Sequence, residues 1–434
     1  MTQQIIDVGL DPNDGEGDPI RDAFIKINEN FTELYNQAGG QASPGVFYVT
    51  PDGDDDNPGT TLALPFATIK AAATAASAYT ATNTSLRATI FVKTGSYTED
   101  NPVVFGQRVT LVGDNLRSTS VLPLNPTQDI FHLRNACYVW GFTFRGFLNP
   151  SAAIAFPADA TPVNNVITTS PYVQNCSCIT GSGTGMRVDG NRAGGTKSMV
   201  TDAFTQVNEG GVGIHILNQG YAQLVSIFTI CTQIGIWCET GGTCSMTNSN
   251  SSFGTYGLVA DGKINYGTTG FTNGVDQFGS LLVLDGLTER PNINQSLSFD
   301  GGVTLYDIWD VTSLVSGQCT VQVSVDITIP IPDNTPVTFW VRSVITASSH
   351  TFEYVGSGNN LITALPQTGA VAIPANQVIQ TNGGSVIYTS TDQRGNFKVG
   401  DQLTINGASG TITGDTFDKS LFAVLTPYIL AIEG

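Results

Sequence analysis

The sequence has 434 residues, which is too long for one compact core and predicts either several domains or one elongated, repetitive body. Glycine accounts for 48 residues and charged residues for only 12%, whereas average proteins have roughly 7% glycine and 25% charged residues. This composition is typical of a turn-rich, all-β chain and excludes an intrinsically disordered one. The formal net charge of −18 argues against nucleic acid as a direct partner.

The chain lacks the usual signals for export, membranes and cofactors. Its first residues, MTQQIIDVGL, have neither a basic nor an apolar region, and no run of 18 apolar residues occurs. We therefore expect no signal peptide and no membrane insertion. The seven cysteines lack zinc-ligand spacing, which predicts free, buried thiols assembled in a reducing cytoplasm. Nucleotide, redox and acyl-transfer motifs are missing, so we expect no cofactor and no metal.

Residues 1–40 are predicted to form an acidic arm and a docking helix. The helix signal covers 18–36, with Asp18 as a cap, Pro19 at the first position and Asp22 in the first turn. Apolar residues then alternate at spacings of 4 and 3, as in a coiled coil: Ile20, Phe24, Ile27, Phe31 and Leu34. An isolated helix of this length is only marginally stable in water. We expect it to dock on its own copies or on another protein, and packing on its own domain is the alternative.

Residues 41–87 are predicted to form the cap of a solenoid. A strand at 47–50, a loop at 51–60 and a small helix at 65–76 follow one another. The acidic loop 52–57 has two interpretations, a calcium site or a turn that caps the strand and the helix. It lacks the spacing and the closing glutamate of an EF-hand, which favours the capping turn.

An internal period of 22 residues predicts stacked coils. The segments 212–216, 234–238 and 256–260 repeat the same apolar pattern, and 222–226 precedes 244–248 by the same interval. We expect Ile214, Ile236 and Leu258 to form one inward column, and residues 88–262 to form about eight coils at this period. The solenoid domain is placed at 88–290.

The segment FYVTPDGDDDNPGTTLALPFATIKAAATAA resembles the opening of right-handed parallel β-helix proteins of the pectate-lyase-like type. The resemblance implies a helix that plugs the end of the solenoid. Because that family includes lyases, glycosidases and phage spikes without catalysis, the fold does not decide the function.

The register also predicts two outward rows. Arg187, His215, Trp237 and Val259 form one row, and Asp189, Leu217, Glu239 and Asp261 form the next. The residues Arg187, His215, Trp237 and Glu239 suit either a subunit contact or a glycan contact. A glycan-degrading enzyme would use Asp189, Glu239 or Asp261. The catalytic signatures of the family's pectin hydrolases are missing, so we expect no enzyme. His132 and His350 are interpreted as isolated, structural residues.

Residues 291–434 are predicted to form one or two antiparallel β subdomains. Strands are expected at 320–329, 337–344, 350–354, 385–390 and 402–405, with Phe339 and Trp340 on opposite faces. The apolar segment 421–432 is expected to be a buried strand or a subunit contact. The fold class is therefore mainly β: a right-handed parallel β-helix preceded by a short N-terminal helix and followed by antiparallel β domains.

Both ends of the chain carry a second resemblance. GDPIRDAFIKINENFTELY, SSHTFEYVGSGNN, GGSVIYTSTDQRGNFKVGD and KSLFAVLTPYILAI are similar to segments of structural proteins in contractile-tailed phages of marine cyanobacteria. The resemblance implies a non-enzymatic virion protein of the tail fibre or baseplate, a homotrimer that docks on other tail proteins through its N-terminal helix. The alternatives are a tailspike depolymerase and a non-catalytic adhesin for host surface glycan.

Overall fold

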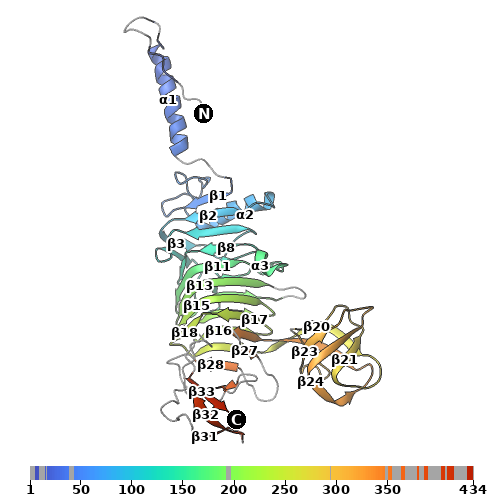
Figure 1. The fold of residues 1–434 in the computed structure, drawn as a ribbon. Coiled ribbons are helices and arrows are strands. Elements are labelled where there is room, and N and C mark those ends of the chain that lie inside the picture. The colour runs from blue at the N-terminus through green and yellow to red at the C-terminus, as the bar shows by residue number, and fades with distance from the viewer. Residues whose placement is uncertain are drawn as a thin grey trace.

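A computed structural model describes residues 5–8, 15, 17–38, 44–191, 197–293 and 295–347, and beyond these only the short strands named below. The chain is mainly β, with a short N-terminal helix, a parallel β-solenoid of about 7 turns and a closed antiparallel barrel (Figure 1). The predicted fold class is confirmed.

Helix α1 (Ile20–Ala38) lies beyond the first coil of the solenoid (Figure 1). Pro19 precedes it, and the Pro19 carbonyl accepts hydrogen bonds from the N–H groups of Asp22 (2.8 Å) and Ala23 (3.0 Å). Asp18 does not act as the predicted cap. Its carboxylate accepts hydrogen bonds from the Asp7 N–H (2.9 Å) and from Lys26 Nζ (2.6 Å), so it fastens the preceding segment to the helix.

Helix α2 (Ile69–Thr82) closes the N-terminal end of the solenoid beside strands β1 (Val46–Val49) and β2 (Ala88–Val92). It buries Ile69 and three alanines in the core. Asp55 accepts hydrogen bonds from the N–H groups of Ala67 (2.9 Å) and Thr68 (2.8 Å). Thr68 is the N-cap of α2 and accepts the Ala71 N–H, and the acidic loop holds Thr68 in place through Asp55. The contacts fit the turn interpretation of this loop.

Two parallel sheets form the body of the solenoid, and its core lies between them. The first contains, in spatial order, β1, β2, β5 (Val109–Gly113), β8 (Tyr138–Trp140), β11 (Tyr172–Thr180), β13 (Ser198–Asn208), β15 (Tyr221–Ile230), β17 (Thr243–Thr247) and β26 (Val344–Ala347), with β3 (Gly95–Glu99), β6 (Thr119–Pro123), β9 (Thr143–Arg145) and β18 (Asn250–Ser252) attached. The second contains β4 (Val103–Val104), β7 (Phe131–His132), β10 (Ala152–Ala155), β12 (Thr184–Asp189), β14 (Val212–Leu217), β16 (Ile234–Glu239), β19 (Tyr256–Asp261) and, antiparallel to β19, β28 (Thr363–Pro366).

The 22-residue period is confirmed as a stack. Ile214 pairs with Ile236, and Ile236 pairs with Leu258, all three inside the core. The other register also holds, because Ala222 pairs with Cys244. The seven turns are fewer than the eight expected. The coils before residue 185 vary in length, so a uniform period miscounts them.

The antiparallel barrel is inserted in the chain between β19 of the second sheet and β26, the last parallel strand of the first sheet. It consists of β20 (Lys263–Thr272), β21 (Gln277–Asp285), β22 (Ser296–Ser298), β23 (Tyr306–Val311), β24 (Cys319–Ile331) and β25 (Pro336–Arg342), around a core that includes Leu284, Val321 and Phe339. The chain then returns to the solenoid, where Val344 pairs with Thr243. The domain predicted at 88–290 therefore includes the barrel strands β20 and β21, because the parallel strands are interrupted after Asp261 and resume at Val344. The 22-residue period itself fades after about residue 263, where barrel strand β20 begins, although the alternating apolar pattern continues through the barrel strands.

The remaining elements are small. α3 (Val166–Thr169) lies in a loop, and β27 (His350–Glu353) pairs with β26. A five-stranded antiparallel sheet contains β29 (Ile379–Gln380), β30 (Val386–Thr389), β33 (Tyr428–Glu433), β32 (Ala408–Gly414) and β31 (Gln402–Ile405). The apolar segment 421–432 overlaps β33, and its residues before 428 lie outside the described ranges.

All seven cysteines are free, and all but the half-buried Cys231 are buried, as predicted. Burial raises the pKa of Cys137 to about 11 and that of Cys176 to about 12, which leaves both thiols protonated and unreactive near neutral pH. Among the helices of the described segments, none is long and apolar enough to cross a membrane.

Candidate functional sites: the N-terminal helix and one flank of the solenoid

The predicted docking residues of α1 are in contact with water in the single chain. The exposed fraction is 78% for Ile20, 58% for Phe24 and 56% for Phe31. Ile27 is half-buried, and the side chain of Leu34 lies outside the described residues. Large apolar side chains grouped on one helix favour burial against another surface.

Polar contacts hold the opposite side of α1. The Nζ atom of Lys26 donates to the Ile5 carbonyl (3.1 Å) and to the Asp18 carboxylate (2.6 Å). The hydrogen bond from Lys26 lowers the pKa of Asp18. These contacts fix the segment before the helix and leave the apolar side available to a partner.

The predicted row lies in register on the second sheet, with Arg187, His215 and Trp237 half-buried, whereas Val259 is buried and not exposed. Arg187 pairs with His215, His215 with Trp237, and Trp237 with Val259. The row continues upstream to His132. On one side of β10, Ala155 pairs with His132. On its other side Ile154 pairs with Met186, so the following residues, Ala155 and Arg187, also lie level with each other. Parallel pairing therefore brings together side chains from separate coils.

His215 is held on two sides. Its ring lies flat on the Trp237 indole, with centroids 4.3 Å apart and planes 9° apart. Its Nε2 atom lies 2.9 Å from Glu239 Oε2. Burial lowers the pKa of His215, and the neighbouring Glu239 opposes that shift only in part. The imidazole is therefore held neutral to lower pH than a free histidine.

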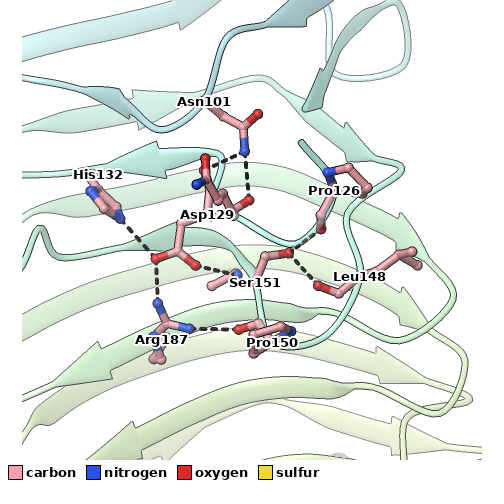
Figure 2. A network of polar contacts seen from close by, with 10 residues as sticks. Asn101, Pro126, Asp129, His132, Leu148, Pro150, Ser151 and Arg187 are labelled. Carbon is pink, nitrogen blue, oxygen red and sulfur yellow. Dashed lines mark hydrogen bonds and ion pairs between the residues drawn. The ribbon is translucent and has the colours of Figure 1, made fainter. Parts of the chain in front are cut away.

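Asp129 connects three segments of the same flank (Figure 2). One carboxylate oxygen contacts His132 Nε2 (2.9 Å) and the Arg187 guanidinium, and the other accepts the Ala152 N–H (2.7 Å). Arg187 also donates to the Pro150 carbonyl (3.0 Å). Burial alone would raise the pKa of Asp129, but the hydrogen bond from His132 and the charge of Arg187 together lower it. The sequence interpretation of His132 as an isolated residue is therefore wrong. His132 belongs to a network with Asp129 and Arg187.

Hydrogen bonds also fix the loop that carries Asp129 (Figure 2). Asn101 Nδ2 donates to the carbonyls of Asn125 (2.8 Å), Gln128 (2.8 Å) and Asp129 (3.1 Å). Ser151 Oγ contacts the carbonyls of Pro126 (2.9 Å) and Leu148 (2.6 Å). The network is therefore pre-organised by hydrogen bonds to backbone carbonyls.

The second outward row holds the three carboxylates considered for catalysis. Asp189 pairs with Leu217, Leu217 with Glu239, and Glu239 with Asp261. Asn218 Nδ2 donates to Asp189 (2.8 Å), and His215 contacts Glu239. Burial, followed by the charge of Glu239, raises the pKa of Asp261. Among the described residues, no cluster of histidine, cysteine and acidic residues is arranged to hold a metal ion.

Taken together, the polar groups of this flank mostly contact one another. Arg187 is occupied by Asp129 and Pro150, and Glu239 by His215. Trp237 has its ring face on His215, while its Nε1 atom is buried without a hydrogen-bond partner among the described residues. This arrangement favours a structural role in joining successive coils over an open binding site.

Comparison with known proteins adds little to the geometry. No family model matches the sequence, and no curated protein matches it significantly. A solved structure described as ORF18 of Geobacillus virus E2 aligns with 93% of this chain and 92% of its own, at 9% sequence identity and a TM-score of 0.23. At that TM-score the likeness does not bear on fold or function.

Proposed function

We propose that the protein is a non-enzymatic structural component of a phage virion, a tail fibre, spike or baseplate-associated protein. The observation that carries the proposal is the exposed apolar side of α1, with Ile20, Phe24 and Phe31, beyond the end of a stiff stack of coils. The terminal resemblances to structural proteins of cyanophages support a place in the tail or baseplate, after assembly in the host cytoplasm.

The apolar side of α1 is the docking surface. Full burial of one large apolar side chain stabilises an association by about 1.5–3 kcal/mol. The alternating spacing of 4 and 3 is compatible with a cluster of three helices. Three copies therefore associate through α1, and the resulting bundle inserts among other tail proteins.

The solenoid acts as the shaft. Continuous parallel pairing through the first sheet, from β1 to β17, gives each coil backbone hydrogen bonds to both neighbours. The Asp129 network adds an ionic connection between β7, β10 and β12 (Figure 2). Such a body transmits force along its axis because interiors packed this way resist compression.

Electron microscopy of the full chain tests this function. With gold on the N-terminus of the purified protein, we expect shafts joined at the labelled end. Antibodies against the protein should decorate the tail or baseplate of the source phage. Single unjoined shafts, or antibody confined to the capsid, would contradict the proposal.

A depolymerase remains the second candidate because of two adjacent carboxylates. Glu239 and Asp261 are register partners, and Asp261 has a raised pKa. The backbones of neighbouring strands lie roughly 4.8 Å apart, which lets two such side chains reach the carboxyl separation of about 5–5.5 Å that retaining glycosidases use. Release of new reducing ends from host polysaccharide, abolished by Glu239→Gln, would establish the enzyme; no release would leave the structural function.

A further inference from the structure

A large cleft lies between the barrel and the last coils of the solenoid. Its volume is about 1230 Å³, which exceeds the roughly 300–1000 Å³ of small-molecule pockets and suits an extended ligand. Its floor is the first sheet, with Tyr221, Thr243 and Ser245, and its wall is the barrel, with Asn292 and Trp309.

Trp309 is an exposed aromatic residue in the lining of the cleft. Its side chain is 65% exposed although it lines the wall formed by β23. An exposed indole offers a flat apolar face together with an N–H donor, and such groups are usually covered in the functional state. Trp309 differs in this respect from Trp237, whose ring face is already covered by His215.

Polar residues without net charge line the same cleft. Among the residues that line the cleft, Asp307 and Arg342 are the charged ones, and they form an ion pair with each other. The amides of Gln219 and Asn292 and the hydroxyl of Thr243 also line it. These groups pair with the hydroxyl groups of a neutral ligand. The overall charge of −18 disfavours a polyanion.

The floor of the cleft continues along the solenoid. Ser245 pairs with Gln223, Gln223 with Val200, and Val200 with Tyr172, all on the outer side of the first sheet. The next residue of this row is Tyr138, whose ring lies 5.7 Å from that of Tyr172. A linear ligand leaving the cleft therefore meets further aromatic and amide groups, one coil at a time.

We propose that this cleft binds a neutral, linear oligosaccharide. Trp309 stacks on one sugar ring, and the amides of Asn292 and Gln219 bind its hydroxyl groups. The binding requires no chemical step. It does not depend on α1, so the docking function and the glycan site fail or succeed separately.

Calorimetric titration of the full chain tests the site. The ligands are hexasaccharides of glucose, galactose or mannose, and hexasaccharides of galacturonic acid as the acidic comparison. At least one neutral ligand should bind, and Trp309→Ala should weaken it at least tenfold, about 1.4 kcal/mol. Phe278→Ala, which removes another exposed aromatic of the barrel outside the cleft lining, is the matched control and should bind normally.

The proposal is overturned if no neutral hexasaccharide binds, if only the acidic one binds, or if Trp309→Ala and Phe278→Ala have equal effects. It is also overturned if Trp309→Ala reduces the mass of the oligomer in light scattering, because the cleft would then hold a second copy of the chain.

Discussion

The imidazole of His215 lies flat against the indole of Trp237, one coil apart, with the ring centroids 4.3 Å from each other. The same imidazole contacts Glu239, 2.9 Å away. A stack of this kind joins two coils by side chains as well as by backbone pairing. It explains how one ring face of an aromatic residue at an outward position is covered within the single chain.

Replacing Trp237 by alanine should lower the stability of the solenoid and leave its oligomeric state unchanged. The variant loses the stack and exposes His215, at a cost of about 1–3 kcal/mol for this half-buried position. We expect the midpoint of thermal unfolding to fall by several degrees. Trp140→Ala, at a half-buried tryptophan outside this stack, is the comparison. A drop in mass by light scattering without a change in midpoint would instead identify the row as a subunit contact.

Loss of the Asp129 carboxylate should weaken the solenoid in a pH-dependent manner. Because the folded-state pKa of Asp129 lies below its ordinary 3.8, its contribution is fully present above that value and is lost as the pH falls through the folded-state pKa. At pH 7, Asp129→Asn should cost about 2–3 kcal/mol, because it leaves Arg187 without its charged partner. The difference from wild type should shrink below pH 4.

Asp159→Asn is the matched control for that experiment. Arg134 also lowers the pKa of Asp159, but the Asp159 side chain is largely exposed to solvent. Surface ion pairs contribute little. Equal effects of the two substitutions on thermal unfolding would show that the buried network has no special role.

Glu99 should give the opposite pH dependence. Its buried carboxylate accepts the N–H groups of Ile69 (2.8 Å) and Lys70 (3.0 Å) at the start of α2, and burial raises its pKa above 4.5. The folded state therefore retains its proton longer than the unfolded state. Stability falls as the pH rises from 4.5 through the folded-state pKa. Glu99→Gln should remove this dependence, and an unchanged pH profile of thermal unfolding would refute the assignment.

The inward column provides a test of the repeat. Ile236 lies between Ile214 and Leu258 and is buried. Ile236→Ala should cost about 2–5 kcal/mol, because it leaves a cavity that the neighbouring coils cannot fill. Ile234→Ala, two residues earlier at a half-buried position, should cost clearly less in the same denaturation experiment. Similar losses would mean that the column is not the core.

Sequence patterns predict the repetitive parts of this protein well. A fixed interval of 22 residues places Ile214, Ile236 and Leu258 in one column, since each coil repeats the same register. The interval also predicts the outward row through His215 and Trp237. The turn formed by the acidic loop also agrees with the sequence, since Asp55 accepts hydrogen bonds from the backbone just before α2.

Other features depend on contacts that local patterns do not encode. Asp129 meets Arg187 across 58 positions, and the variable coils between them hide the shared register. The return of Val344 to the first sheet depends on the barrel closing on itself. The cleft beside Trp309 exists only after that closure, so no motif marks it.

The measurement that most directly tests the docking function is the mass of the full chain in solution by light scattering. We expect three chains for wild type and one chain for the double variant Phe24→Ala and Phe31→Ala, which keeps helix propensity while removing the apolar surface. Asn28→Ala, at an exposed polar position of the same helix, should remain trimeric. A monomeric wild type, or a double variant of unchanged mass, would contradict the claim that α1 joins the copies.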